Sequence, residues 1–286
     1  MNTTAITDLK DPALKIFSGM SETELFHYYE PEPGVFVAES ANVMIRALEA
    51  GYEPLSLLIE RERFDTEGAQ VFSAVREILG EEKLDSLPVY IGEREVVTAL
   101  TGYKLVRGLW GVFRRKELLP LRDFLKDKDR IAVLYDIVNP TNTGAIIRSA
   151  AALGMDGVVL TFPSVDPLTR RSARVSMGTA FQIPWTKLRK NDLKGPAFIG
   201  ELKSLGFKTV AMALREDSAG VDDERIVGAS RLAVVLGTEG EGLPDEIISV
   251  CDLKAMIPMH HGVDSLNVAA ASAVIFWEIM KGKQRL

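Results

Sequence analysis

The chain has 286 residues, of which 47% are hydrophobic and 26% charged, with a formal net charge of −6. Its single cysteine, Cys251, excludes an internal disulfide framework and suits a reducing compartment. No apolar run approaches the roughly 20 residues of a membrane span, and residues 1–15 lack a signal-peptide pattern, so we expect a cytoplasmic protein with no membrane partner.

The length favours two domains, and the first half predicts a small α/β unit. Residues 1–30 are expected to form a short helical extension that ends at a Pro-Glu-Pro turn. The domain itself is expected over 31–117, with strands alternating with glycine-terminated helices. Its predicted strands are 34–40, 55–60, 88–92 and 108–114, and its predicted helices are 41–51, 66–80 and 93–102. A charged linker is expected over 118–129.

The second half, residues 130–286, predicts an open parallel sheet with helices between the strands. It opens with the continuous apolar run 131–138, and further strand–helix alternation follows through 157–162, 198–206, 208–214 and 231–237. A short helix, a strand and a long apolar helix are then expected over 244–252, 253–259 and 265–282.

Basic residues concentrate in two segments of this acidic chain. Residues 104–130 hold nine basic and four acidic side chains, a balance of +5, and residues 167–195 hold seven basic and one acidic, a balance of +6. Either segment alone is compatible with an ordinary solvated face, but together they favour a polyanionic partner.

Three segments of the second half carry residues suited to chemistry. In the first, 139–154, Asn142 is a candidate helix N-cap and Arg148 lies among core residues, where a semi-buried arginine would need a partner. An N-capped helix with a surface arginine explains the same residues. The second, 232–244, ends a strand at Gly237 and continues with Gly240 and two acids, which suits a cationic or hydroxyl-rich ligand but also an ordinary turn.

The third segment, 256–276, places Ser265 and Asn267 at the start of the long apolar helix, with Ser265 the natural N-cap. The adjacent His260 and His261 have poor spacing for a metal site, so we expect no metal. Cys251 has no basic neighbour in the sequence that would make it reactive, and we expect it to be a core residue.

Taken in order, the three segments resemble the motifs of the SpoU family of RNA ribose methyltransferases, within the SPOUT superfamily. Asn142, Gly144 and Arg148 match the core of the first motif, the strand and glycine loop ending in Gly-Thr-Glu-Gly-Glu-Gly match the second, and the run from Ser265 to Val268 matches the third. The N-terminal half resembles, less specifically, the L30e-like RNA-binding domain of many members.

The resemblance implies an open α/β sheet with a deep trefoil knot, a homodimer formed through the knot region, and S-adenosylmethionine as cofactor. It implies cofactor contacts at Leu236, Gly237, Gly240, Ile257, Met259 and Leu266. It implies that Arg148 acts at the ribose 2′-hydroxyl, that Asn142 holds Arg148, that Glu239 and Asn267 brace the site, and that Ser265 caps the motif helix. Because a guanidinium stays protonated, Arg148 is better viewed as an orienting group than as a base.

The expected reaction is therefore methyl transfer to a ribose 2′-hydroxyl, with ribosomal RNA favoured over transfer RNA by analogy with the L30e-like domain. A non-catalytic RNA-binding or ribosome-assembly protein on the same fold is the alternative, disfavoured because all five motif side chains are present. A dinucleotide-dependent oxidoreductase is disfavoured, because the sequence lacks the early G-x-G-x-x-G fingerprint that such an enzyme needs after its first strand. We expect one basic RNA-binding surface in the dimer, made by Lys104, Arg107, Arg114, Arg115, Arg170, Arg171 and Arg174.

Overall fold

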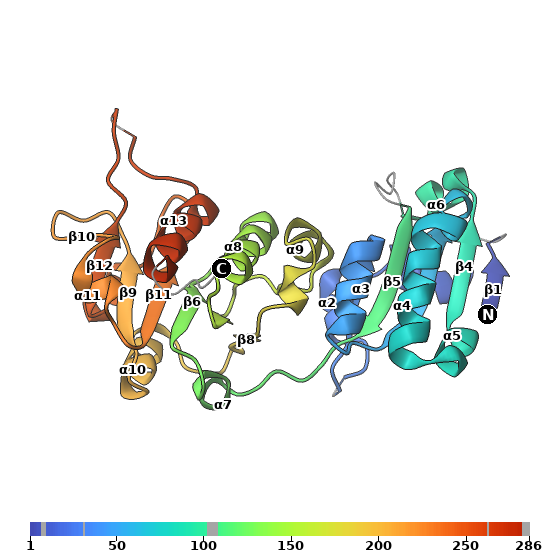
Figure 1. Ribbon diagram of the computed structural model, residues 1–286, viewed down its shortest axis with the longest axis horizontal. Coiled ribbons are helices and arrows are strands. Elements are labelled where there is room, and N and C mark those ends of the chain that lie inside the picture. The colour runs from blue at the N-terminus through green and yellow to red at the C-terminus, as the bar shows by residue number, and fades with distance from the viewer. Residues whose placement is uncertain (7–9, 31, 102–107, 262, 282–286) are drawn as a thin grey trace. The chain divides into compact units, whose positions relative to one another are not determined.

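The computed structural model describes residues 1–6, 10–30, 32–101, 108–261 and 263–281. The chain divides into two compact units, each built on its own sheet (Figure 1). The first unit contains 1–117 together with 168–181, and the second contains 118–167 and 182–286. Residues 168–181 were expected in the second domain, and the structure packs them with the first unit instead.

The first unit contains a five-stranded sheet in which only β5 runs against its neighbours. In spatial order its strands are β1 (Asn2–Ala5), β4 (Pro88–Gly92), β3 (Pro54–Glu60), β5 (Leu109–Arg114) and β2 (Val35–Glu39). Its α-helices are α1 (Lys15–Ser18), α2 (Glu22–Phe26), α3 (Ala41–Glu49), α4 (Ala69–Leu79), α5 (Glu81–Ser86), α6 (Arg94–Thr101) and α9 (Arg170–Val175). The expected alternation of strands and helices over 34–101 and 108–114 is confirmed.

The N-terminal residues are part of this unit and not an appended helical extension. Strand β1 pairs in parallel with β4, in a register that places Asn2 opposite Pro88. Leu14, Phe17 and Leu25 are at most 2% exposed and belong to the core of the unit. The sequence around β1 carries no apolar alternation, which is why a sheet-edge strand was missed there.

The second unit contains a seven-stranded sheet in which every neighbouring pair is parallel. In spatial order its strands are β10 (Ala219–Gly220), β12 (Leu253–Met256), β9 (Lys208–Met212), β11 (Leu232–Leu236), β6 (Arg130–Leu134), β7 (Gly157–Leu160) and β8 (Trp185–Lys187). Its α-helices are α7 (Leu121–Leu125), α8 (Pro140–Ala152), α10 (Gly195–Ser204), α11 (Glu224–Val227), α12 (Asp245–Val250) and α13 (Val268–Met280). The expected open parallel α/β sheet is confirmed.

The core of the second unit explains why its strands read as continuous apolar runs. Strands β6 and β11 are buried along their whole length, since helices cover both faces of the sheet. Helices α7, α10 and α12 contribute to one core cluster, whereas α8 and α13 contact each other on the other side of the sheet in Figure 1. The predicted linker 118–129 takes part in this core, because Phe124 and Leu125 are buried.

Candidate functional site

A cavity of about 580 Å³ lies in the second unit where strands β9, β11 and β12 end. Because these strands are parallel, their carboxyl ends meet at one edge of the sheet, the usual ligand edge of open α/β sheets. The volume is within the range of pockets for small molecules. Its walls include nine residues expected from the sequence: Leu236, Gly237, Glu239, Gly240, Ile257, Met259, Ser265, Leu266 and Asn267.

Other lining residues were not expected. Met212, Ala213, Leu214 and Arg215 end or follow β9 and line the same cavity. The sequence signal was available, because β9 was predicted as a strand of the same parallel sheet and its carboxyl end had to reach the same edge. Met212 and Met256, with the expected Met259, bring polarisable thioethers to the walls.

The glycine loop after β11 is closed tightly on itself. The Thr238 and Gly242 backbones exchange hydrogen bonds, each with an N···O distance of 3.2 Å. A Cβ atom on Gly237 would lie 2.4 Å from the Gly242 carbonyl carbon, so any side chain there would collide with the backbone of its own loop. Gly240 has φ of +91° with open space around it. Gly237 is therefore required by the fold of the loop, and Gly240 by its backbone conformation.

Side chains from all three motif segments meet at this edge. The Asn267 amide nitrogen donates to the Asn142 side-chain oxygen at 3.2 Å, and it also donates to the Glu239 carboxylate. Asn142 is buried at 5% exposure, whereas Asn267 and Glu239 are exposed. The segments 139–154, 232–244 and 256–276 are thus joined by one polar cluster.

The helix caps differ from those expected. Asn139, not Asn142, is the N-cap of α8, and its side chain accepts from the Thr141 backbone amide. Asn267, not Ser265, is the N-cap of α13 and accepts from the amides of Ala269 and Ala270. In both cases the capping residue has extended backbone angles directly before the helix, which sequence spacing alone did not locate.

Arg148 lies on the outside of α8. It is exposed, it does not line the cavity, and it makes no hydrogen bond or ion pair within the described part of the chain. The expected semi-buried position is wrong. The Asn142 side chain, which was expected to hold Arg148, is instead bonded to Asn267.

Asp136 is a carboxyl near the same sheet edge that the sequence did not single out. It follows β6 with φ of +57°, and its carboxylate accepts from the Thr161 hydroxyl at 2.9 Å. Burial raises the pKa of the Asp136 carboxyl above its ordinary value, and the Thr161 hydrogen bond offsets this only in part.

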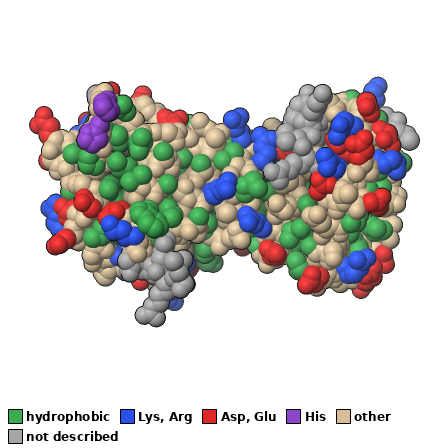
Figure 2. Space-filling view, turned by 45° about the horizontal axis from the view of Figure 1, so that its top comes forward, with side chains coloured by type: hydrophobic (Ala, Val, Ile, Leu, Met, Phe, Trp, Pro, Cys, Tyr) green, Lys and Arg blue, Asp and Glu red, His purple; other side chains and the backbone are tan. Residues whose placement is uncertain are grey.

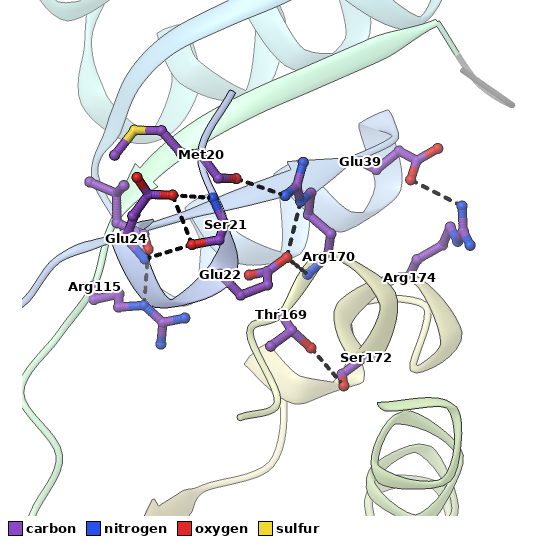
Figure 3. A network of polar contacts seen from close by, with 11 residues as sticks. Met20, Ser21, Glu22, Glu24, Glu39, Arg115, Thr169, Arg170, Ser172 and Arg174 are labelled. Carbon is purple, nitrogen blue, oxygen red and sulfur yellow. Dashed lines mark hydrogen bonds and ion pairs between the residues drawn. The ribbon is translucent and has the colours of Figure 1, made fainter. Parts of the chain in front are cut away.

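Several arginines of the expected basic surface have partners within the first unit (Figure 3), and the surface itself stays a prediction. Arg170 donates to Glu22 at 3.0 Å and Arg174 donates to Glu39 at 3.2 Å, so both are paired inside the first unit. Arg115 is buried and donates to the Val35 carbonyl. The remaining four members are accounted for as follows: Arg114 pairs with Glu53, Arg171 also has an interaction partner, and Lys104 and Arg107 lie outside the described residues.

Two further features of the described residues bear on the chemistry. They include no group of three or more His, Cys, Asp or Glu side chains placed to hold a metal ion. Burial raises the pKa of the Cys251 thiol to about 11, so this thiol is poorly suited to act as a nucleophile.

None of the helices that the structure describes is long and apolar enough to cross a membrane.

The sequence profile of the SpoU rRNA Methylase family matches residues 129–277, which is more than half of the chain. The chain belongs to this family. The matched region contains the cavity-lining residues and the Asn142–Asn267–Glu239 cluster. The chain is accordingly a methyltransferase that acts on RNA.

Relatives match nearly the whole chain. An uncharacterized tRNA/rRNA methyltransferase of Mycobacterium tuberculosis is 29% identical over 274 residues, covering 96% of this chain and 90% of the relative. The 23S rRNA (guanosine(2553)-2′-O)-methyltransferase RlmP of Bacillus subtilis is 27% identical, covering 78% and 88%. An AdoMet-bound rRNA methyltransferase structure from Sinorhizobium meliloti has a TM-score of 0.77 at 25% identity, with 99% of each chain covered.

S-adenosylmethionine is the cofactor of this protein, and the cavity suits it. The glycine loop lets the ligand approach the backbone, since Gly240 and Gly242 have open space where side chains would otherwise stand. Glu239 and Glu241 supply carboxylates beside a cavity that must accept a sulfonium and an amino group. The rest of the lining mixes apolar side chains such as Leu236 and Ile257 with polar ones such as Thr238 and Asn267.

Proposed function

We propose that this protein transfers a methyl group from S-adenosylmethionine to a ribose 2′-hydroxyl of ribosomal RNA. The observation that carries the proposal is the cluster of Asn142, Asn267 and Glu239 at the edge where the cofactor cavity opens. The activity for which the Bacillus subtilis relative is named, 2′-O-methylation of 23S rRNA, supports both the acceptor atom and the RNA class.

In this proposal the backbone at Leu236, Gly237, Ile257 and Leu266 holds the cofactor, with Gly240 and Met259 completing the site. Bound S-adenosylmethionine supplies an electrophilic methyl group. The tight loop at 237–242 presents backbone donors and acceptors in fixed positions, so the chain orients its ligand without rearranging.

The acceptor side of the site is assigned to the polar cluster and to Arg148. The Asn267 amide nitrogen can only donate hydrogen bonds and cannot act as a base. We therefore assign it to holding the side-chain oxygens of Asn142 and Glu239 in place. We assign Arg148 to the RNA. Its guanidinium is exposed and has no partner within the described residues, so it is available for a phosphate or for the developing charge on the ribose oxygen. Ser265 is exposed at the cavity and is assigned to the substrate side as well.

We also propose that the protein works as a homodimer and that the cavity-forming segments are threaded as a trefoil knot. The surface around α13 exposes large apolar side chains, with Leu266 at 40%, Val274 at 38% and Trp277 at 51% exposure. Hydrophobic side chains are also prominent on the face of the second unit that Figure 2 displays. Light scattering on the purified protein tests the dimer, and Trp277→Glu should shift it towards a monomer.

The activity is tested with purified protein, labelled S-adenosylmethionine and two unmodified transcripts, 23S ribosomal RNA and a transfer RNA pool. The product is digested and scored for alkali-resistant, 2′-O-methylated dinucleotides. We expect label in ribose of the ribosomal RNA, and label in a base would refute the assigned acceptor. Arg148→Ala should abolish transfer while calorimetry shows unchanged cofactor affinity, because Arg148 does not line the cavity.

A further inference from the structure

The seven basic residues of 167–195 fall into two groups in the structure. Arg170 and Arg174 are paired with Glu22 and Glu39, and Arg171 and Lys187 also have interaction partners. The remaining three, Arg189, Lys190 and Lys194, are exposed and make no side-chain hydrogen bond or ion pair within the described residues. All three lie in the loop from 189 to 194 between β8 and α10, which we call the basic loop.

The acidic groups near the basic loop leave it positive. The one acid inside it, Asp192, turns its carboxylate to the backbone amide of Arg189 at 2.6 Å. Glu246, on α12, lies beside the first residue of α10, with a carboxylate oxygen 3.6 Å from where a Gly195 Cβ would stand. The chain has a net charge of −6, so its long-range field repels RNA. Binding of RNA therefore needs a local concentration of cations, such as the three on this six-residue loop.

The position of the basic loop in the sheet relates it to the cavity. Strand β8 is parallel to β7, β7 to β6, and β6 to β11, so the residues after β8 leave the sheet at the edge where the glycine loop leaves β11. Strand β8 is three places from β11, which corresponds to about 14 Å along the sheet. The segment that carries Asn139 and Asn142 leaves the same edge between them, after β6.

We propose that Arg189, Lys190 and Lys194 bind phosphates of the substrate RNA that flank the methylated nucleotide. The inference rests on the proposed function and deepens it by naming a substrate contact in the catalytic unit. A strand whose ribose lies at the mouth of the cavity can continue along the carboxyl edge of the sheet to the basic loop. The cations there are unpaired and exposed, and they need no rearrangement to meet a phosphate.

The test uses the full chain and unmodified 23S ribosomal RNA transcript as the probe. The variant R189Q/K190Q/K194Q removes the three charges from the loop. The control, R122Q/K126Q/R225Q, removes the same number of exposed charges in or beside helices α7 and α11, which precede β6 and β11 and so lie at the opposite edge. Of the three, Arg122 pairs with Glu201 and Arg225 with Asp223. Affinity is measured over a series of salt concentrations, and cofactor affinity is measured separately by calorimetry.

We expect the loop variant to bind the transcript more weakly, with its salt slope reduced by about two units, since each single-strand phosphate contact contributes about 0.7. The KM for RNA should rise, while kcat and cofactor affinity stay unchanged. The control should keep the wild-type slope. Equal slopes in the wild type and the loop variant, or an equal loss in loop variant and control, would overturn the proposal. If the wild type bound no RNA, the proposed function would fail first, and this inference with it.

Discussion

The side chains of Asn267 and Asn142 lie 125 positions apart in the chain and share a hydrogen bond of 3.2 Å. The same Asn267 amide reaches Glu239, while its oxygen caps α13 through the amides of Ala269 and Ala270. One residue therefore fixes the start of the C-terminal helix and connects it to the glycine loop and to the first motif. Asn142 is buried, and Asn267 is the hydrogen-bond partner of its side-chain oxygen within the described residues.

Asn267→Ala should destabilise the second unit by about 1–3 kcal/mol, because it removes the α13 cap and the hydrogen bond to the Asn142 oxygen. Asn267→Asp is the matched comparison, since its carboxylate still accepts from Ala269 and Ala270 but cannot donate to Asn142 or Glu239. We expect the aspartate to recover the capping part of the loss only. Urea unfolding of the wild type and both variants measures this. The difference between aspartate and alanine reports the cap, and an aspartate variant as stable as the wild type would show that the side-chain cluster contributes nothing.

Gly237→Ala should abolish cofactor binding and lower stability, because the added Cβ meets the carbonyl of Gly242 and the amide of Leu243 within the same loop. Gly80→Ala is the control, since Gly80 does not line the cavity, its Cβ meets nothing within 4 Å, and it suffers only from its positive φ, at about 1–2 kcal/mol. Calorimetry with S-adenosylmethionine compares the two. A Gly237 variant that folds and binds like the wild type would contradict the closed geometry of the loop.

The sequence predicted the parts of the fold that depend on local pattern. The apolar run 131–138 covers all but the first residue of β6, the run 231–237 contains β11, and the motif segments contain most of the cavity-lining residues. The sequence did not predict that residues 168–181 belong to the first unit. This placement involves the ion pairs of Arg170 with Glu22 and of Arg174 with Glu39, and neither composition nor motif spacing identifies such distant partners. The burial of Arg115 was missed for the same reason: charge counts treat every arginine as available.

Asp136→Asn should raise the free energy of unfolding at pH 7. Burial raises the folded-state pKa of Asp136, so above its ordinary pKa of 3.8 the folded protein binds more protons than the unfolded chain, and its stability falls as pH rises through that window. Asparagine accepts the same Thr161 hydrogen bond without a charge, and it tolerates the positive φ. The gain over the wild type should shrink as the pH is lowered through this window, because the folded-state carboxyl then takes up its proton. Urea unfolding at pH 4, 5.5 and 7 measures the trend, and a gain that is independent of pH would contradict this cause.

Arg174→Ala should loosen the first unit without changing how RNA binding depends on salt. Glu39 is 3% exposed, and one of its carboxylate oxygens has no partner among the residues that the structure describes. Arg174 donates to the other oxygen at 3.2 Å, so removing the guanidinium leaves a buried carboxylate uncompensated. Breaking such a pair from one side costs about 2–4 kcal/mol. Hydrogen exchange should therefore quicken in β2 and α9, and Glu39→Gln in the same chain should restore much of the protection, because the amide carries no charge. Arg189→Ala is the control for charge, since it removes the same +1 from an exposed, unpaired residue and should leave exchange unchanged. If Arg174→Ala instead lowered the salt slope of RNA binding and left exchange in β2 and α9 as in the wild type, Arg174 would be an RNA contact and the pairing with Glu39 would not be its role.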